Sequence, residues 1–295
     1  MCESKFSEER VGCSMTSETV ELDRKRRQLL AMLRSYGSCL VAFSAGVDST
    51  VLAKAAVLAL GDRAVAVTGV SPSLAVGELE EARRLAQRIG IRHIEIETHE
   101  LDQPSYASNP PDRCYHCKME LYHQLHDLRQ RLRVSIIVNG NNADDSEDFR
   151  PGNQAAEQQQ VASPLALCGL RKQEIRQLAR EWELPVWDKP AMPCLSSRIA
   201  YGQQVTPGRL AMIDQAERYL RQLGHPVVRV RYHAGDLARL EVPPDDVARL
   251  CEPAVRTGIV AYFQQLGFKF VTLDLAGFRS GSLNVLVPEQ ELKEA

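Results

Sequence analysis

Residues 44–49 read Ser-Ala-Gly-Val-Asp-Ser, a composition suited to holding an anion. The small side chains let backbone N–H groups approach an anion closely, and the serine hydroxyls add further donors. The segment follows a short apolar run and precedes an alanine- and leucine-rich stretch, so the N-terminus of a helix would add its positive dipole potential. We therefore expect a phosphate ligand here; a plain strand-to-helix turn capped by serine and aspartate is the alternative.

A second polar segment, residues 140–145, reads Gly-Asn-Asn-Ala-Asp-Asp and is followed by Asp148. Adjacent carboxylates such as Asp144 and Asp145 repel each other unless a cation or solvent relieves the charge. Magnesium bridging ATP phosphates is the natural cation, so both aspartates are candidate Mg²⁺ ligands. A solvated acidic loop is the alternative.

Three of the eight cysteines carry chemical signals. Cys114 and Cys117 form a Cys-x-x-Cys pair at an expected helix start, where both sulfurs can bind one metal or cycle as a redox pair. Cys194 is followed by Leu-Ser-Ser-Arg, and the hydroxyls together with the Arg198 guanidinium favour a thiolate of lowered pKa. With Cys194 the pair would supply three thiolates, the number that holds a [4Fe–4S] cluster with one iron open. Zinc, a redox pair and inert thiols are the alternatives.

These segments need a regular framework, and apolar runs alternate with helical patterns along the first part of the chain. We expect strands at 39–43, 64–70, 93–98 and 134–138 and helices at 18–36, 48–60, 74–89, 119–131 and 171–182. This alternation predicts an α/β fold with a parallel sheet covered on both faces. The carboxyl ends of parallel strands share one rim, so the polar segments after the first and fourth strands should meet there.

The pattern changes after the proline-broken segment 188–193. We expect helices at 210–223 and 254–266 and strands at 227–232, 239–242 and 269–274, which predict a smaller α+β domain. The predicted organisation is therefore a disordered start over 1–17, a Rossmann-like nucleotide-binding domain over 18–200 and an α+β domain over 201–295.

The overall composition limits the class of protein. The 295 residues include 36 Lys and Arg against 38 Asp and Glu, giving a net charge of −2. The lack of a basic excess argues against a nucleic-acid partner. The sequence contains neither an apolar run long enough to span a membrane nor the apolar core of a secretory signal, so we expect a cytoplasmic protein with no membrane partner.

Four segments together resemble one known family. Residues 44–49 are similar to the PP-loop, the Ser-Gly-Gly-x-Asp-Ser signature of ATP pyrophosphatases, with Ala45 in place of a glycine. Because Ala45 departs from that pattern, a positive φ at this position would cost free energy. With the Asn-x-Asp-Asp segment, the Pro-Cys-Leu-Ser-Ser-Arg segment at 193–198 and the run at 228–242, the chain resembles the LarE family of ATP-dependent sulfur transferases over about residues 22–287.

The resemblance implies a reaction. Members of that family use MgATP to adenylate a carboxylate of pyridinium-3,5-biscarboxylic acid mononucleotide, release pyrophosphate and install sulfur, on the way to a nickel-pincer nucleotide. The implied ATP-binding residues are Ser44, Gly46, Val47, Asp48 and Ser49. The other implied site residues are Cys194, Glu217 and Arg229 in catalysis and Arg198 and Arg231 in ligand binding.

The resemblance also implies two possible sulfur sources. In many members the cysteine that matches Cys194 gives up its own sulfur and is left as dehydroalanine. Some members with three cysteines use a [4Fe–4S] cluster instead, and Cys114, Cys117 and Cys194 resemble that branch. The family further implies a homotrimer or hexamer with a small-molecule substrate.

Other functions are compatible with parts of the pattern. A tRNA thiolation enzyme also combines a PP-loop with several cysteines, but the near-neutral charge argues against it. An amide-forming PP-loop synthetase would need an ammonia source and would not need the three cysteines. A nucleotide-binding regulator would bind ATP without releasing pyrophosphate.

Overall fold

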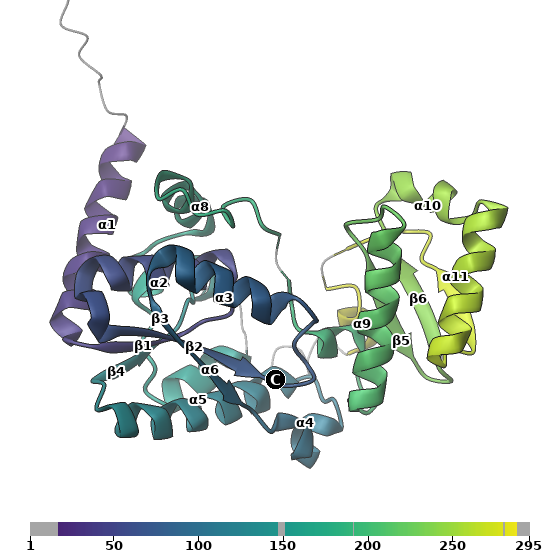
Figure 1. Ribbon diagram of the computed structural model, residues 1–295, viewed down its shortest axis with the longest axis horizontal. Helices are drawn as coiled ribbons and strands as arrows, with labels where there is room; N and C mark the ends of the chain where they lie inside the picture. The colour runs from purple at the N-terminus through teal and green to yellow at the C-terminus, as the bar shows by residue number, and fades with distance from the viewer. Residues whose placement is uncertain (1–16, 147–150, 191, 280, 288–295) are drawn as a thin grey trace, which may run out of the picture.

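The computed structural model describes residues 17–146, 151–190, 192–279 and 281–287 and has two lobes (Figure 1). The larger lobe is built on a four-stranded sheet and the smaller lobe on a three-stranded sheet. Almost all of the predicted disordered start, 1–17, lies outside the described residues, as does Asp148.

The larger sheet is parallel throughout, with the strand order β3-β2-β1-β4. Its strands are β1 (Cys39–Ala42), β2 (Ala64–Val70), β3 (Arg92–Glu97) and β4 (Ile136–Val138). The α/β class and the four predicted strands are therefore confirmed, with small differences at the strand ends.

Two separate cores cover the two faces of this sheet. In β1, Cys39 and Val41 point into one core and Leu40 points into the other, as expected for alternating side chains in a strand buried on both faces. Figure 1 shows α2 and α3 on one side of the sheet and α5 and α6 on the other. The helices of this lobe are α1 (Ser17–Tyr36), α2 (Val47–Leu60), α3 (Glu78–Ile89), α4 (Pro104–Ala107), α5 (Arg113–Leu132), α6 (Pro151–Gln158), α7 (Pro164–Leu167) and α8 (Lys172–Glu181).

Helix α5 begins six residues before the predicted start at 119, because the Pro-Pro-Asp sequence that precedes Arg113 suits a helix entry. The Arg113 side chain is buried and donates hydrogen bonds to the Asn109 side chain and to the Ser196 carbonyl, which fixes this first turn. Cys114 and Cys117 consequently lie within a regular helix.

The smaller lobe has the strand order β5-β6-β7, with β5 antiparallel and β7 parallel to β6. Its elements are α9 (Pro207–Gln222), β5 (Arg229–His233), β6 (Leu237–Glu241), α10 (Pro244–Leu250), α11 (Pro253–Leu266) and β7 (Phe270–Leu273). Leu195 and Ile199 pack into the core of this lobe, and Ile199 forms an isolated parallel bridge with Tyr232 of β5. The segment that follows Cys194 is thus anchored in the smaller lobe.

Short 3-10 turns link these elements: η1 (Gly61–Arg63), η2 (Glu100–Asp102), η3 (Ala143–Ser146), η4 (Leu195–Arg198) and η5 (Asn284–Leu286). Across the described ranges, every helix is too short or too polar to cross a membrane.

Candidate active site

A cavity of about 480 Å³ lies at the carboxyl ends of the parallel strands. Its walls come from the loop after β1, the segment after β4, helix α5 and the segment that joins the two lobes. The predicted site residues that line it are Ser44, Asp48, Ser49, Asp145, Cys114, Cys117, Cys194 and Arg198. The candidate phosphate loop and the three candidate cysteines therefore share one cavity.

The loop at 44–49 turns the chain from β1 into α2. Ala45 has a φ of 57°, the left-handed conformation for which the resemblance predicts glycine, and its side chain is buried. Gly46 is the N-cap of α2 and Val47 is its first residue, so the free N–H groups of the first helical turn point towards the cavity end of β1. The two serines brace the loop, since Ser44 Oγ lies 3.1 Å from Ser49 Oγ.

Gly140, after β4, makes this arrangement possible. A Cβ atom at this position would lie 2.9 Å from the backbone nitrogen of Ser49, closer than real contacts allow. Glycine therefore lets the segment after β4 lie directly against the first turn of α2.

Asp48 is held by two partners that are distant in the sequence. Its Oδ1 accepts a hydrogen bond from the Asn142 amide at 3.1 Å, and its Oδ2 pairs with the Lys172 ammonium at 2.5 Å. Lys172 is the first residue of α8, and no motif marks it in the sequence. It brings a positive charge to a loop that has no basic residue of its own.

The two predicted magnesium ligands occupy different positions. Asp144 accepts hydrogen bonds from the Lys172 backbone N–H at 2.8 Å and from the Arg171 guanidinium at 3.0 Å, so it caps the start of α8. Asp145 lines the cavity and accepts the Asn142 backbone N–H at 3.0 Å. Of the two aspartates, Asp145 is thus the one that lines the cavity, and the magnesium site stays a prediction.

The environment of Cys114 and Cys117 disfavours the ionised thiol. Burial raises the pKa of Cys117 well above its ordinary value, and the charges of Cys194 and Glu100 raise it further. Burial also raises the pKa of Cys114, while the Arg113 guanidinium acts in the opposite direction. The raised pKa of each thiol favours its protonated form, and a bound metal would favour the thiolate.

The Arg198 guanidinium does not point its hydrogen bonds at the Cys194 sulfur. Among the described residues its partners are oxygens: the Cys194 and Pro193 carbonyls, the Ser197 hydroxyl and the Glu217 carboxylate. It therefore shapes the main chain around Cys194, and an anion in the cavity would meet its positive charge.

The donor set fits an iron–sulfur cluster better than a single ion. No group of three or more His, Cys, Asp or Glu side chains within the described ranges converges closely enough to hold one metal ion. The ligands of a four-iron cluster bind different irons, so three thiols need only face a common space. Cys114, Cys117 and Cys194 are free thiols that line one cavity, which meets that requirement.

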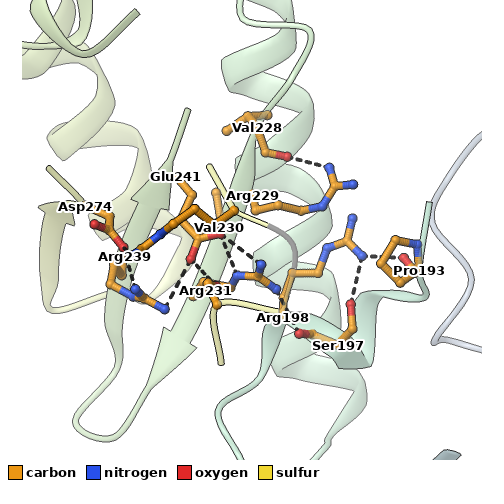
Figure 2. A network of polar contacts seen from close by, with 12 residues as sticks. Pro193, Ser197, Arg198, Val228, Arg229, Val230, Arg231, Arg239, Glu241 and Asp274 are labelled. Carbon is orange, nitrogen blue, oxygen red and sulfur yellow. Dashed lines mark hydrogen bonds and ion pairs between the residues drawn. The ribbon is translucent and has the colours of Figure 1, made fainter. Parts of the chain in front are cut away.

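Behind Arg198 lies a network of arginines and carboxylates (Figure 2). Arg198 and Glu217 form an ion pair at 3.0 Å with both side chains 1% exposed, and Arg231 pairs with the buried Glu241 at 2.9 Å. The Arg229 guanidinium donates to the Val228 carbonyl at 2.8 Å and lies 5.2 Å from the Phe278 ring centre.

Charge and burial act together in this network. Burial would raise the pKa of Glu217, but the charges of Arg198, Arg221 and Arg229 lower it below its ordinary value. Burial and then the Arg198 charge lower the pKa of Arg229 to about 10. Since Glu217, Arg229 and Arg231 are not among the described residues that line the cavity, their predicted contact with substrate stays a prediction.

A small-residue loop between β1 and the N-terminus of α2, at the rim of a parallel sheet with helices on both faces, is the arrangement of the PP-loop class of proteins. The chain belongs to the LarE family, the pyridinium-3,5-bisthiocarboxylic acid mononucleotide synthases. It is 36% identical to the synthase of that name from Lactiplantibacillus plantarum over 273 residues, which cover 92% of this chain and 98% of that protein. The predicted family is thereby confirmed.

Two uncharacterised proteins are also similar. One from Synechocystis is 45% identical over 89% of this chain and 98% of its own length. One from Methanocaldococcus jannaschii is 26% identical over 82% of this chain and 90% of its own length. A search of protein-family models finds no match.

Proposed function

We propose that this protein is an ATP-dependent sulfur transferase of nickel-pincer nucleotide synthesis. It adenylates a carboxylate of pyridinium-3,5-biscarboxylic acid mononucleotide, releases pyrophosphate and replaces the adenylate with sulfur to give a thiocarboxylate. The observation that carries this proposal is the single cavity that contains both the phosphate loop and three cysteines. The membership of the LarE family supports the identity of the substrate.

The phosphate loop would bind MgATP. The N–H groups of the first turn of α2 and the serine hydroxyls hold the phosphates, and Asp48 and Asp145 supply oxygen ligands for Mg²⁺. Lys172 would hold the Asp48 carboxylate in position, since its ammonium lies 2.5 Å from Asp48 Oδ2.

The cysteines would deliver the sulfur. Cys114, Cys117 and Cys194 would hold a [4Fe–4S] cluster, which when bound supplies an iron position open to a transferable sulfide. Without a cluster, the Cys194 sulfur would attack the acyl carbon and AMP would leave, giving a thioester. Removal of the Cys194 Cα proton by a base and cleavage of the Cβ–S bond would then release the thiocarboxylate and leave dehydroalanine in the chain.

The arginine network would receive the phosphate of the mononucleotide. Arg198 lines the cavity and pairs with Glu217, and Figure 2 shows Arg229 and Arg231 beside Arg198. The same proposal includes a trimeric or hexameric assembly and a cytoplasmic location. It includes no nucleic-acid partner.

The test of the activity is pyrophosphate release from MgATP, with and without pyridinium-3,5-biscarboxylic acid mononucleotide. Wild type should release pyrophosphate only with the mononucleotide, and Asp48→Ala should abolish the release. Stimulation by tRNA instead of the mononucleotide would overturn the proposal.

The test of the sulfur source is the iron and acid-labile sulfide content of protein purified and reconstituted without oxygen. About four irons per chain are expected in wild type, and Cys114→Ala, Cys117→Ala and Cys194→Ala should each lose them. Cys251→Ala is the matched control, since Cys251 is exposed and lies outside the cavity walls formed by the described residues. Iron retained in a triple Cys→Ala variant would rule out this cluster site.

A further inference from the structure

Glu100 is a buried acid in the cavity wall that has no part in the chemistry above. It is the first residue of η2, its surface is 2% exposed, and it lines the cavity. Its Oε1 accepts a hydrogen bond from the Ser71 hydroxyl at 2.5 Å. Its Oε2 is buried and has no hydrogen-bond partner among the described residues.

Other buried carboxylates of the protein are paired. Glu217 pairs with Arg198, and Glu241 pairs with Arg231. For Glu100, by contrast, no lysine or arginine of the described ranges forms an ion pair with the carboxylate. Its neighbour Cys117 gives no compensation, because an ionised thiol there would repel it.

A carboxylate removed from water is costly when no positive charge lies near it. A cation that enters the cavity with a ligand removes this cost.

We propose that Glu100 supplies the counter-charge for the cationic ring of a bound pyridinium mononucleotide. The inference rests on the proposed function and adds how the ring is recognised. An N-substituted pyridinium carries a permanent positive charge and has no N–H, so its attraction to a carboxylate needs proximity and not a hydrogen bond. A buried carboxylate in the cavity wall can supply this attraction to the ring.

The charges around the cavity match the whole ligand. Arg113, Lys118 and Arg198 also line the cavity and can face its anionic phosphate and carboxylate groups. Asp48 and Glu78 line it too, but they pair with Lys172 and Lys189. Asp145 is a further lining carboxylate. Glu100 provides negative charge among these cations, so the cavity is complementary to a zwitterionic ligand and not simply to an anion.

The test compares two ligands that differ in ring charge. The probes are nicotinic acid mononucleotide, whose ring is a pyridinium cation, and its 1,4-dihydro form, whose ring is neutral. Dissociation constants are measured by calorimetry for wild type and for Glu100→Gln, which keeps the shape of the side chain. Wild type should bind the cationic form about tenfold or more tightly than the neutral form, and Glu100→Gln should lose most of that preference.

Asp102→Asn is the matched control, because Asp102 lies in the same turn with its side chain 85% exposed. Asp102→Asn should prefer the cationic ring over the neutral ring to the same extent as wild type. Binding of the neutral form by Glu100→Gln at wild-type affinity shows that this variant is folded.

A wild-type protein without any preference for the cationic ring would overturn the inference on its own, whether or not Glu100→Gln folds. An unchanged preference in Glu100→Gln would also overturn it. Failure of the proposed function is a separate result, namely no mononucleotide-dependent pyrophosphate release by wild type, and the ring-charge comparison can still be made in that case.

Discussion

At the scale of single residues, Asp48 links the phosphate loop to two other segments. Its carboxylate meets Asn142 after β4 and Lys172 at the start of α8. Residues 44–49 supply N–H groups and hydroxyls but no cation, so Lys172 brings the positive charge that pairs with Asp48 in this loop.

Lys172→Met should lower kcat/KM for ATP in pyrophosphate release by about tenfold or more, because Asp48 loses the charged partner that holds its carboxylate in the phosphate loop. Lys25→Met is the control: Lys25 pairs with Glu174 of α8 at 2.7 Å but does not reach the loop. It should reduce thermal stability and leave the ATP kinetics unchanged. Equal kinetic effects of both substitutions would contradict the role of Lys172.

The buried Arg198–Glu217 ion pair should contribute to the free energy of unfolding. Glu217→Gln leaves Arg198 buried without its counter-charge, which should lower the free energy of unfolding by about 3 kcal/mol in urea titrations. Glu21→Gln, at the exposed Arg24–Glu21 pair, should have little effect.

The pH dependence of stability follows from the same pair. Folding lowers the pKa of Glu217 from its ordinary value of 4.5, so its contribution is complete above that value and is lost as the pH falls through the lower folded pKa. The difference in stability between wild type and Glu217→Gln should therefore shrink on acidification below about pH 4.5. A stability difference between the two proteins that grows as the pH falls would contradict the lowered pKa of Glu217.

At the scale of elements, the sequence predicts the larger lobe well because both faces of its sheet are buried. Apolar runs such as β1 are local signals, and so is Gly46 in the loop that follows β1. They predicted the strands and the edge of the sheet at which the cavity lies. The Asp48–Lys172 pair and the buried Glu100 could not be predicted, because each depends on segments far apart in the chain. The capping role of Asp144 depends likewise on where α8 begins.

The contact between the segment after β4 and helix α2 gives a prediction at this scale. Gly140→Ala would place a Cβ atom 2.9 Å from the Ser49 nitrogen and displace the first turn of α2, so ATP affinity should fall by about tenfold or more. Gly208→Ala, where a Cβ atom meets nothing within 4 Å, is the control and should bind ATP normally. Normal ATP binding by Gly140→Ala, measured by calorimetry, would show that α2 tolerates the displacement.

At the scale of the whole molecule, the segment between the lobes joins the nucleotide site to the cysteine site. Lys189 pairs with Glu81 and Glu78 of α3 and reaches the Ala45 carbonyl of the phosphate loop at 3.5 Å. Five residues later, Cys194 enters the cavity just before the chain packs into the smaller lobe. The chain therefore runs directly from the phosphate loop to Cys194, as the proposed coupling of carboxylate activation to sulfur delivery requires.

A single-turnover reaction of Cys194→Ala with MgATP and pyridinium-3,5-biscarboxylic acid mononucleotide tests most directly whether adenylation and sulfur delivery can be separated. The products are measured by mass spectrometry and by a pyrophosphate assay. This variant should release pyrophosphate at close to the wild-type amount and form no thiocarboxylate, because the proposed adenylation depends on the phosphate loop and the proposed sulfur delivery depends on Cys194. Wild-type yields of the thiocarboxylate from Cys194→Ala would contradict it.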